Sequence, residues 1–536
     1  MNKASHSAAC FALLSGLLTT SRLVGAEESL VGDWAGGFEQ GKDYVYLQLH
    51  FKSKDGKISG TYDAPLLFQQ GRSLKQVTIK SSTVSFEVPN KPDTRLFTGE
   101  LRDGVLTGQM KEGATEQPFR FSRLAPIQAK HYEGTYEIER GHFVFIKSAV
   151  DMGIGALQFI DFKNGRVSGL FPTSTTSFFT GPAVLVLFPV EATVKFTLDP
   201  QGQGTGLAWV GSQKWSARRV KLREEEVSFT NGAVTISGTL ISPNTPQPHP
   251  VVICVAGGTA AATREMFRHM AEFFAMNGVA SLIYDKRGLG SSTSDWLRAG
   301  FGDLADDALA GVRLLKARPG IDANRIGLFG ASQSGWVVAQ AASQSKDVAF
   351  IISQSGPGVN PEEQELYRSE AWLRADGFSE EEIRDSMKFI RQRYQCALTG
   401  EGWDALAETE REAKNKRWFA YTGGHVGKEH PSWHFWSLIR GYDPVPVLEK
   451  VTCPVLAVFG AKDTFLPAEK SARIWQTALE KAGNKDVTIR VFPDGDHSLI
   501  ESKTGGLKEA GRARRFVPGF FETLRDWTMK QTQVQH

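Results

Sequence analysis

The pattern of hydrophobic and polar positions changes near the middle of this chain. Up to about residue 222 it alternates, as in residues 44–51, where one face is apolar and the other mixed. The pairs Asp55-Gly56, Asp103-Gly104 and Asn164-Gly165 interrupt this alternation, and such pairs favour tight hairpins. From about residue 226, short continuous apolar runs alternate with helical patterns, which is typical of a parallel sheet covered on both faces. The sequence therefore predicts an all-β N-terminal region followed by an α/β domain.

The N-terminal region contains a short internal repeat. Residues 54–60 (KDGKISG) and 163–169 (KNGRVSG) match in residue type at every position. Upstream of each lies a similar start motif, Gly32-Asp-Trp34 in one case and Glu133-Gly-Thr-Tyr136 in the other. We expect two related antiparallel β-modules, which serve as a scaffold, as a wall that restricts the substrate, or as a docking module.

The second half has the alternation of an α/β fold. A hairpin at residues 227–240 precedes six apolar runs that we expect to be strands, at residues 251–255, 280–284, 325–329, 349–352, 455–459 and 487–491. Between about residues 356 and 450 the chain is instead helical, charged and rich in tryptophan, which indicates an inserted cap. The expected domains are a signal peptide (1–26), β-module 1 (27–125), β-module 2 (126–224) and a catalytic domain (225–536) with its helical cap insertion (356–450).

Composition and the N-terminus narrow the possible functions. The 536 residues are 41% hydrophobic and 23% charged, and a net charge of +3 argues against nucleic-acid binding. Lys3, the apolar residues 8–20 and the small residues 24–26 form the pattern of a signal peptide, which is too short to span a bilayer. We therefore expect an exported protein, periplasmic or secreted, without stable membrane insertion. The remaining cysteines, Cys254, Cys396 and Cys453, predict no disulfide framework and no metal site.

One short stretch, GLFGASQSGW at residues 327–336, has the features of a nucleophile elbow. This sharp strand-to-helix turn strains the backbone of its central residue, so the positions two before and two after it must be small. Gly330 and Ser334 meet that requirement around Ser332. Ser334 is the poorer nucleophile because its own flanking positions would be Ser332 and the bulky Trp336. We therefore predict Ser332 as the nucleophile.

Partners for such a serine follow two later strands. A serine nucleophile needs a histidine base, which in turn needs a carboxylate to orient it. Asp463 lies in the loop after the run at 455–459, and His497 in the loop after 487–491. Asp494 and Asp496 are rival acids, but they are too close to His497 in the same short loop to turn back to its ring. We predict Asp463 as the acid and His497 as the base.

A glycine-rich loop, residues 255–260 (VAGGTA), leaves the first strand of the parallel series. We predict that the backbone N–H groups of Gly258 and Gln333 form an oxyanion hole, in which each donor contributes about 10²–10³ in rate. The alternative is an ordinary strand-to-helix turn.

These motifs, together with residues 284–291 (YDKRGLGS), resemble the α/β-hydrolase superfamily from about residue 226 onward. The order serine, acid, histidine is the order found in that superfamily. The resemblance is closest to exported bacterial carboxylesterases related to the prolyl-oligopeptidase and dienelactone-hydrolase branches, which carry an N-terminal β-domain. Two positions depart from the pattern: Ser334 stands where glycine is usual, and Ala256 where many members have histidine.

We therefore expect a serine hydrolase, a carboxylesterase that acts on a small-molecule ester through an acyl-enzyme and needs no cofactor. A serine exopeptidase or acyltransferase with the same triad stays open, because Glu362, Glu363 and Glu365 are candidates for binding a free amino terminus. A hydrolase-derived binding protein is the third alternative. The histidines of the cap (His425, His430 and His434) lack the regular spacing of a metal site, and the sequence leaves the oligomeric state open.

Overall fold

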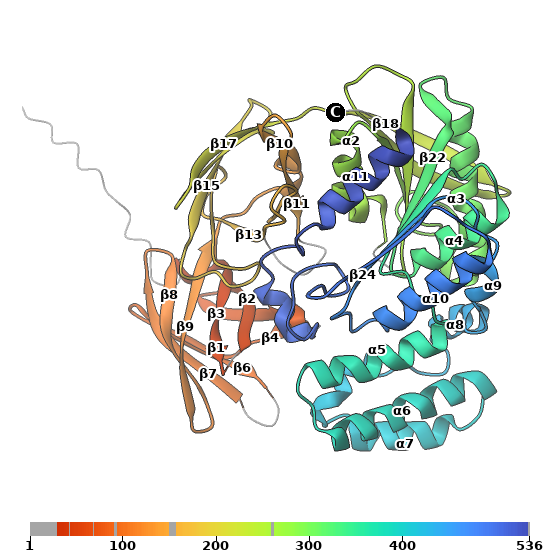
Figure 1. Ribbon diagram of the computed structural model, residues 1–536. Coiled ribbons are helices and arrows are strands. Elements are labelled where there is room, and N and C mark those ends of the chain that lie inside the picture. The colour runs from red at the N-terminus through yellow and green to blue at the C-terminus, as the bar shows by residue number, and fades with distance from the viewer. Residues whose placement is uncertain are drawn as a thin grey trace, which may run out of the picture.

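Three β-sheets follow one another along the chain (Figure 1). The computed structural model describes residues 29–41, 43–67, 69–90, 94–149, 157–258 and 262–533. The predicted signal peptide at residues 1–26 lies outside these described residues. Within them, no helix is both long enough and apolar enough to cross a membrane.

The first sheet is an up-and-down meander in which the first strand pairs with the last. Its order is β4-β3-β2-β1-β9-β8-β7-β6-β5. The predicted turns Asp55-Gly56 and Asp103-Gly104 join neighbouring strands, and both residues of each pair have positive φ, as a tight hairpin requires. The strands are β1 (Gly32–Gln40), β2 (Asp43–Lys54), β3 (Lys57–Ala64), β4 (Gln69–Ser73), β5 (Lys75–Lys80), β6 (Thr83–Pro89), β7 (Thr94–Arg102), β8 (Val105–Glu112) and β9 (Thr115–Leu124).

The second sheet is a closed eight-stranded barrel with its own aromatic core. The strands are β10 (Gly134–Glu139), β11 (His142–Ser148), β12 (Leu157–Asp161), β13 (Val167–Pro172), β14 (Ser177–Thr180), β15 (Ala192–Leu198), β16 (Gly204–Gly211) and β17 (Lys214–Arg219). The pair Asn164-Gly165 differs from the predicted tight hairpin, since only Gly165 has positive φ. The connection is longer because Asp161 caps it, accepting the backbone N–H groups of Lys163 (2.8 Å) and Asn164 (3.2 Å).

The two β-regions begin with the same local geometry. Gly32 and Gly134 have φ of +128° and +126°. In each region an arginine of the last strand, Arg123 or Arg219, donates a hydrogen bond to the carbonyl of the residue before the glycine. The aromatic residue two positions after each glycine donates to the carbonyl four residues before itself. By contrast, the two matching turns of the sequence repeat join different strand pairs, β2 with β3 and β12 with β13.

The third sheet contains the strands that the apolar runs predict. Its order is β18-β19-β21-β20-β22-β23-β24-β25. The hairpin β18–β19 pairs antiparallel with β21, and every later pairing is parallel. The strands are β18 (Arg223–Asn231), β19 (Val234–Ser242), β20 (His249–Val255), β21 (Ala280–Tyr284), β22 (Ile321–Ala331), β23 (Phe350–Gln354), β24 (Val455–Gly460) and β25 (Val487–Phe492).

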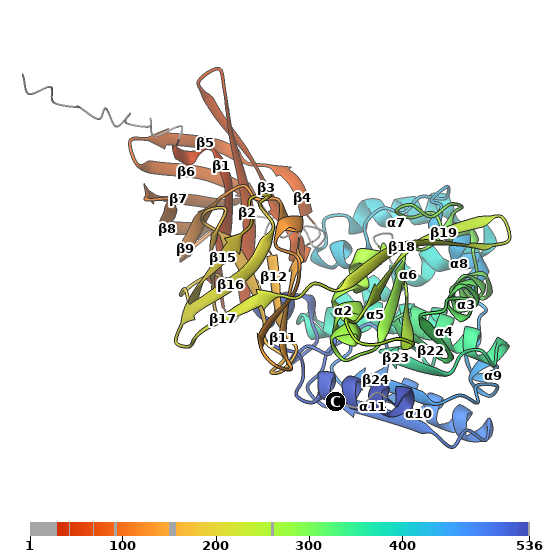
Figure 2. The same ribbon diagram turned by 90° about the horizontal axis from the view of Figure 1, so that it is seen from above.

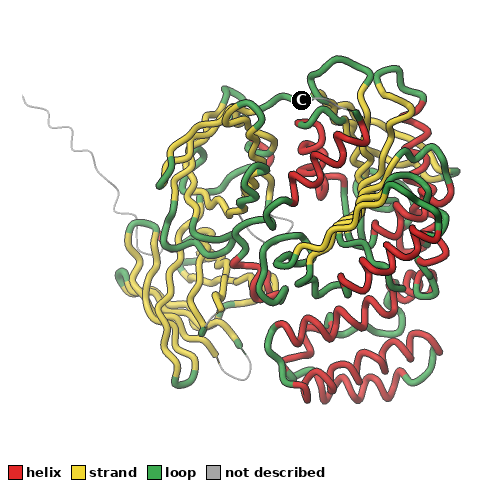
Figure 3. Tube along the Cα trace, viewed as in Figure 1, coloured by secondary structure: helices red, strands yellow, loops and turns green. Residues whose placement is uncertain are grey.

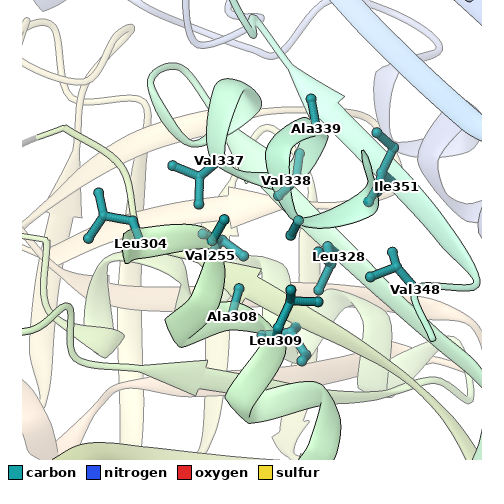
Figure 4. Packing of buried hydrophobic residues seen from close by; sticks show 14 of the residues in the cluster. Val255, Leu304, Ala308, Leu309, Leu328, Val337, Val338, Ala339, Val348 and Ile351 are labelled. Carbon is teal, nitrogen blue, oxygen red and sulfur yellow. The ribbon is translucent and has the colours of Figure 1, made fainter. Parts of the chain in front are cut away.

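Helices cover both faces of this sheet, and successive residues of β20 divide between the two cores. Val251, Ile253 and Val255 pack into one cluster, and Val252 and Cys254 into the other. Figure 4 shows the first cluster, where β20, β22 and β23 meet two helices. The covering helices are α3 (Phe301–Lys316), α4 (Ser334–Gln344) and α10 (Ala468–Lys481) on one face, and α2 (Arg268–Met276) and α11 (Phe520–Thr532) on the other.

A helical segment separates β23 from β24, at the place where the sequence predicts a cap. Its helices α5, α6 and α7 lie beside the sheet domain and have a small core of their own (Figures 1 and 3). The helices are α5 (Pro361–Ala375), α6 (Glu380–Thr399), α7 (Trp403–Ala413), α8 (Ser432–Ile439) and α9 (Val445–Leu448).

The barrel packs against the α2 and α11 side of the third sheet (Figure 2). Phe162 of the barrel, Phe273 of α2 and Phe521 of α11 form a triangle of rings with centroids 5.1–5.3 Å apart. A backbone ladder adds to this contact. Residues 165–167 bond to residues 514 and 516, and residues 515 and 517 bond to residues 499–501. The loop that follows β25 is therefore connected to the barrel through one intervening segment.

Candidate active site

Ser332 lies on a strained turn between β22 and α4. Its φ is 57°, a left-handed conformation that is uncommon for serine, and its N–H donates to the carbonyl of Gln354 at the end of β23 (2.8 Å). A Cβ at Gly330 would lie 2.5 Å from the backbone oxygen of Ser334. The turn therefore has the tight geometry of a nucleophile elbow, and glycine is required at residue 330.

Ser334, the departure from the usual glycine, fits into the elbow without exposing its hydroxyl. The residue is fully buried, and its Oγ donates to the backbone oxygen of Ala331 at 2.7 Å. A buried hydroxyl that is already hydrogen-bonded within the turn is unavailable to a substrate. Ser332, in contrast, lines the cavity described below.

The buried Asp463 and the partly buried His497 form a pair across two loops. His497 Nδ1 lies 2.8 Å from Asp463 Oδ2, and Asp463 Oδ1 accepts the N–H groups of Phe465 (2.7 Å) and Leu466 (3.1 Å). A carboxylate only accepts hydrogen bonds, so the neutral ring carries its proton on Nδ1 and leaves Nε2 free as a base. Burial alone would lower the pKa of His497, but the charge and hydrogen bond of Asp463 raise it above its ordinary value of 6.5.

The rival acid Asp496 belongs to its own loop. Its Oδ1 accepts the backbone N–H groups of Ser498 (2.8 Å) and Ile500 (2.9 Å), and burial raises the pKa of its carboxyl to about 6. Asp494 is exposed. The structure thus brings Asp463, and neither neighbour of His497, to the ring.

The candidate residues meet at one cavity of about 780 Å³. Ser332, Gln333, Gly258 and His497 all line it, and each comes from the carboxyl end of a parallel strand, where ligands bind in open α/β sheets. No hydrogen bond joins Ser332 to His497 in the described part of the chain. Such contacts are often long in ligand-free sites and tighten when substrate binds.

The glycine-rich loop after β20 is held close to the elbow. A Cβ at Gly258 would lie 2.9 Å from the side-chain Cδ of Gln333, so a larger residue there would have to displace the Gln333 side chain. The neighbouring carbonyl of Gly257 accepts a hydrogen bond from Lys286 Nζ at 2.9 Å. Lys286 is 2% exposed and lies 3.9 Å above the ring of Trp296, and burial lowers its pKa to about 8.

Several residues at the site were not identified from the sequence. Phe465 stacks on His497 with ring centroids 4.4 Å apart, and its position two residues after Asp463 was the available signal. Lys286 lies in the segment quoted above for the family resemblance, which gave it no role. The barrel contributes Lys147, Gln158 and Ile160 to the cavity wall. No sequence pattern connects these three residues with the site, because they precede the elbow by more than 150 residues in the chain.

Comparison with known proteins adds sequence support. The family Serine aminopeptidase, S33, matches residues 246–503, a range that includes Ser332, Asp463 and His497. Esterase EstD of Thermotoga maritima is 23% identical over 322 residues, which are 58% of this chain and 70% of the esterase. The uncharacterized peptidase YuxL of Bacillus subtilis is 20% identical over 307 residues, which are 56% of this chain and 38% of that protein.

Among solved structures, an esterase of Pyrococcus furiosus has 17% sequence identity and a TM-score of 0.37, covering 58% of this chain and 92% of its own. A dienelactone hydrolase of Anabaena variabilis has 16% identity and a TM-score of 0.32, covering 59% and 98%. The order and direction of the strands, the elbow after β22 and the family match agree with one another. Residues 246–503 thus match the serine aminopeptidase S33 family of serine hydrolases, and the part of the chain from β18 to α11 has the fold of an α/β-hydrolase.

Proposed function

We propose that this serine hydrolase is a carboxylesterase that works through an acyl-enzyme with Ser332, His497 and Asp463 as its triad. The observation that carries the proposal is the left-handed Ser332 beside a cavity that His497 also lines, with His497 held by Asp463. Ser332 Oγ attacks the acyl carbon while His497 Nε2 takes its proton. His497 then protonates the leaving alcohol, and water releases the acid by the same route.

The oxyanion that forms in each step needs donors fixed in advance. We assign the N–H groups of Gly258 and Gln333 to this role, because both residues line the cavity and they are in contact with each other. Lys286 acts as a positioning residue, since its hydrogen bond to the carbonyl of Gly257 holds the loop that carries Gly258.

Ester chemistry is favoured over the exopeptidase alternative by the charges of the site. A free amino terminus requires an uncompensated carboxylate, and among the described residues that line the cavity Glu365 is the one carboxylate. Arg368 already neutralises it at 2.6 Å. Of the other two candidates, Glu362 is exposed and Glu363 pairs with Lys470. The named esterase among the relatives agrees with this preference.

Labelling with a fluorophosphonate probe tests the proposal. The wild-type protein should be labelled and Ser332→Ala should not, even though Ser334 is still present two residues away. A panel of 4-nitrophenyl esters of increasing acyl length, compared with 4-nitroanilides of single amino acids, then tests the reaction class. We expect turnover of the esters only.

Two outcomes would contradict this assignment. Labelling that survives in Ser332→Ala and is lost in Ser334→Ala would identify Ser334 as the nucleophile instead of Ser332. Faster turnover of the nitroanilides than of the esters would favour the exopeptidase.

We also propose that the protein is exported, on the signal-peptide pattern of residues 1–26, and that its two β-regions are related modules. The shared geometry at Gly32 and Gly134 supports the second point. The barrel's share of the cavity wall supports a role in restricting the substrate.

A further inference from the structure

The charged side chains around the cavity are mainly cationic. Lys147 of β11, Arg368 of α5 and Arg393 of α6 line it, and Glu365 is the single carboxylate among the described residues of its wall. His269 lines it as well, but burial lowers the pKa of His269 to about 3, so this ring is neutral near pH 7. Within the described cap, two guanidinium groups therefore stand beside one carboxylate at the cavity.

One of these cations already has its counterion. Glu365 Oε2 accepts hydrogen bonds from Arg368 at 2.6 Å and from the hydroxyl of Tyr394 at 3.4 Å. The same carboxylate oxygen is thus shared by two donors of the cap. Its charge is compensated by Arg368.

Arg393 has no such partner. It is 7% exposed, and its terminal nitrogens donate to the carbonyls of Thr422 (2.6 Å) and Gly424 (3.1 Å). Its Nε is buried without a hydrogen-bond partner, and no carboxylate of the described residues forms an ion pair with it. A guanidinium stays protonated even when buried, and a buried charge that lacks a close counterion is costly. Glu410 and Glu365 act on Arg393 only through space, without forming an ion pair with it. An anionic ligand in the cavity would supply the missing charge.

We propose that the cavity binds an ester that carries a carboxylate on its acyl or alcohol part, and that Arg393 recognises this carboxylate. The statement that the ligand is an ester rests on the proposed function. Trp433, Phe435 and Trp436 of the cap also line the cavity, so the part of the substrate between ester and carboxylate is apolar. Arg393 lines the cavity and forms no ion pair with a described residue, so its guanidinium is the charge left for the carboxylate, and a cavity of about 780 Å³ accommodates a molecule of this kind.

The test compares substrates of equal acyl length and different charge. The acyl series is 4-nitrophenyl pentanoate, the mono-4-nitrophenyl ester of glutarate and 4-nitrophenyl 5-aminopentanoate, and the alcohol pair is phenyl acetate and 4-carboxyphenyl acetate. We expect a kcat/KM advantage of about 10- to 100-fold for the carboxylate in one of the two sets, the range given by a hydrogen bond to a charged group. Arg393→Gln should remove the advantage by raising KM for the charged ester far more than for the neutral ester.

Arg391→Gln is the matched control, because Arg391 lies on the same helix but is exposed, and its loss removes the same net charge. It should keep the preference, and Arg393→Lys should keep part of it. An unchanged melting temperature shows that the cap is intact in each variant.

Binding separates this inference from the proposed function. In calorimetry, 5-phenylpentanoate should bind wild-type protein more tightly than 5-phenylpentanamide, and Arg393→Gln should abolish the difference. This result would stand even if no ester were hydrolysed. The inference is overturned if neither substrate set nor the binding pair prefers the carboxylate, or if Arg391→Gln loses the preference as fully as Arg393→Gln.

Discussion

The change Asp463→Asn tests the assignment of Asp463 as the acid, because it alters only the contact between this side chain and His497. Asp463 Oδ1 accepts two backbone N–H groups, so the asparagine oxygen has a strong reason to stay there. The new amide nitrogen then faces His497 Nδ1 as a donor. The ring must present its lone pair at Nδ1 and carry its proton on Nε2, where it is unable to accept the proton of Ser332.

The expected loss is large and has a second signature in pH. The wrong tautomer lowers kcat by about 10⁴-fold, or about 5 kcal/mol, with little change in the fold. In the wild type, kcat/KM should fall as the pH drops through the pKa of His497, which Asp463 holds above its ordinary value. Without that carboxylate, burial dominates and lowers the pKa, so the residual activity of Asp463→Asn should persist to lower pH.

Steady-state kinetics from pH 5 to 9 on a 4-nitrophenyl ester, with thermal melting of each variant, provides the assay. Asp496→Asn is the matched control. Its side chain also lies near His497, but its Oδ1 caps the loop, and an asparagine oxygen does the same. Two results would refute the assignment of Asp463. One is a larger loss of kcat in Asp496→Asn than in Asp463→Asn. The other is a fall of activity at low pH that occurs at the same pH in Asp463→Asn as in the wild type.

Three further results are expected. Ser334→Gly should keep most of the activity in an ester assay, because it loses only a hydrogen bond worth about 1 kcal/mol. Ser334→Val should be inactive, because its branched side chain has no room in the buried turn. Equal activity of the two variants would contradict the assignment of the elbow. Lys286→Met should lower kcat about 10- to 100-fold at nearly constant KM, because the loop carrying Gly258 loses its tether, and a lower melting temperature with normal kcat would reduce Lys286 to a structural role. Mass spectrometry of the mature protein should find a chain that starts near Glu27 outside the cytoplasm, and an intact N-terminus on cytoplasmic protein would exclude export.

The strands of the third sheet were predictable because a parallel strand is buried on both faces and therefore appears in the sequence as a continuous apolar run. The run at residues 251–255, for example, supplies side chains to both cores. Ser332 and Asp463 each follow such a run, whereas His497 follows the edge strand β25, which is only partly buried and contains Thr488 and Arg490. Their convergence could be predicted from topology alone.

What the sequence did not reveal depends on contacts between distant parts of the chain. Arg393 lies on a charged amphipathic helix, where an arginine is exposed by default, and only the packing of the cap buries it. Lys147 lies on a barrel strand, and the alternating pattern of that strand predicts an ordinary sheet residue at this position. Lys147 lines the cavity only because the barrel packs against the catalytic domain. The tight hairpin expected at Asn164-Gly165 failed because the side chain of Asp161 caps a longer turn.

The backbone ladder between the barrel and the loop after β25 links activity to the completion of folding. Residues 165–167 are synthesised long before residues 499–501 and 514–517, so the ladder forms only after residue 517 has left the ribosome. Contacts over such a sequence separation form slowly. His497 lies two residues before residues 499–501, which belong to this ladder. A molecule whose barrel is unfolded lacks residues 165–167 at the outer edge of the ladder. The gain of activity during refolding should therefore follow the slowest structural phase, and heat inactivation should coincide with the loss of the barrel.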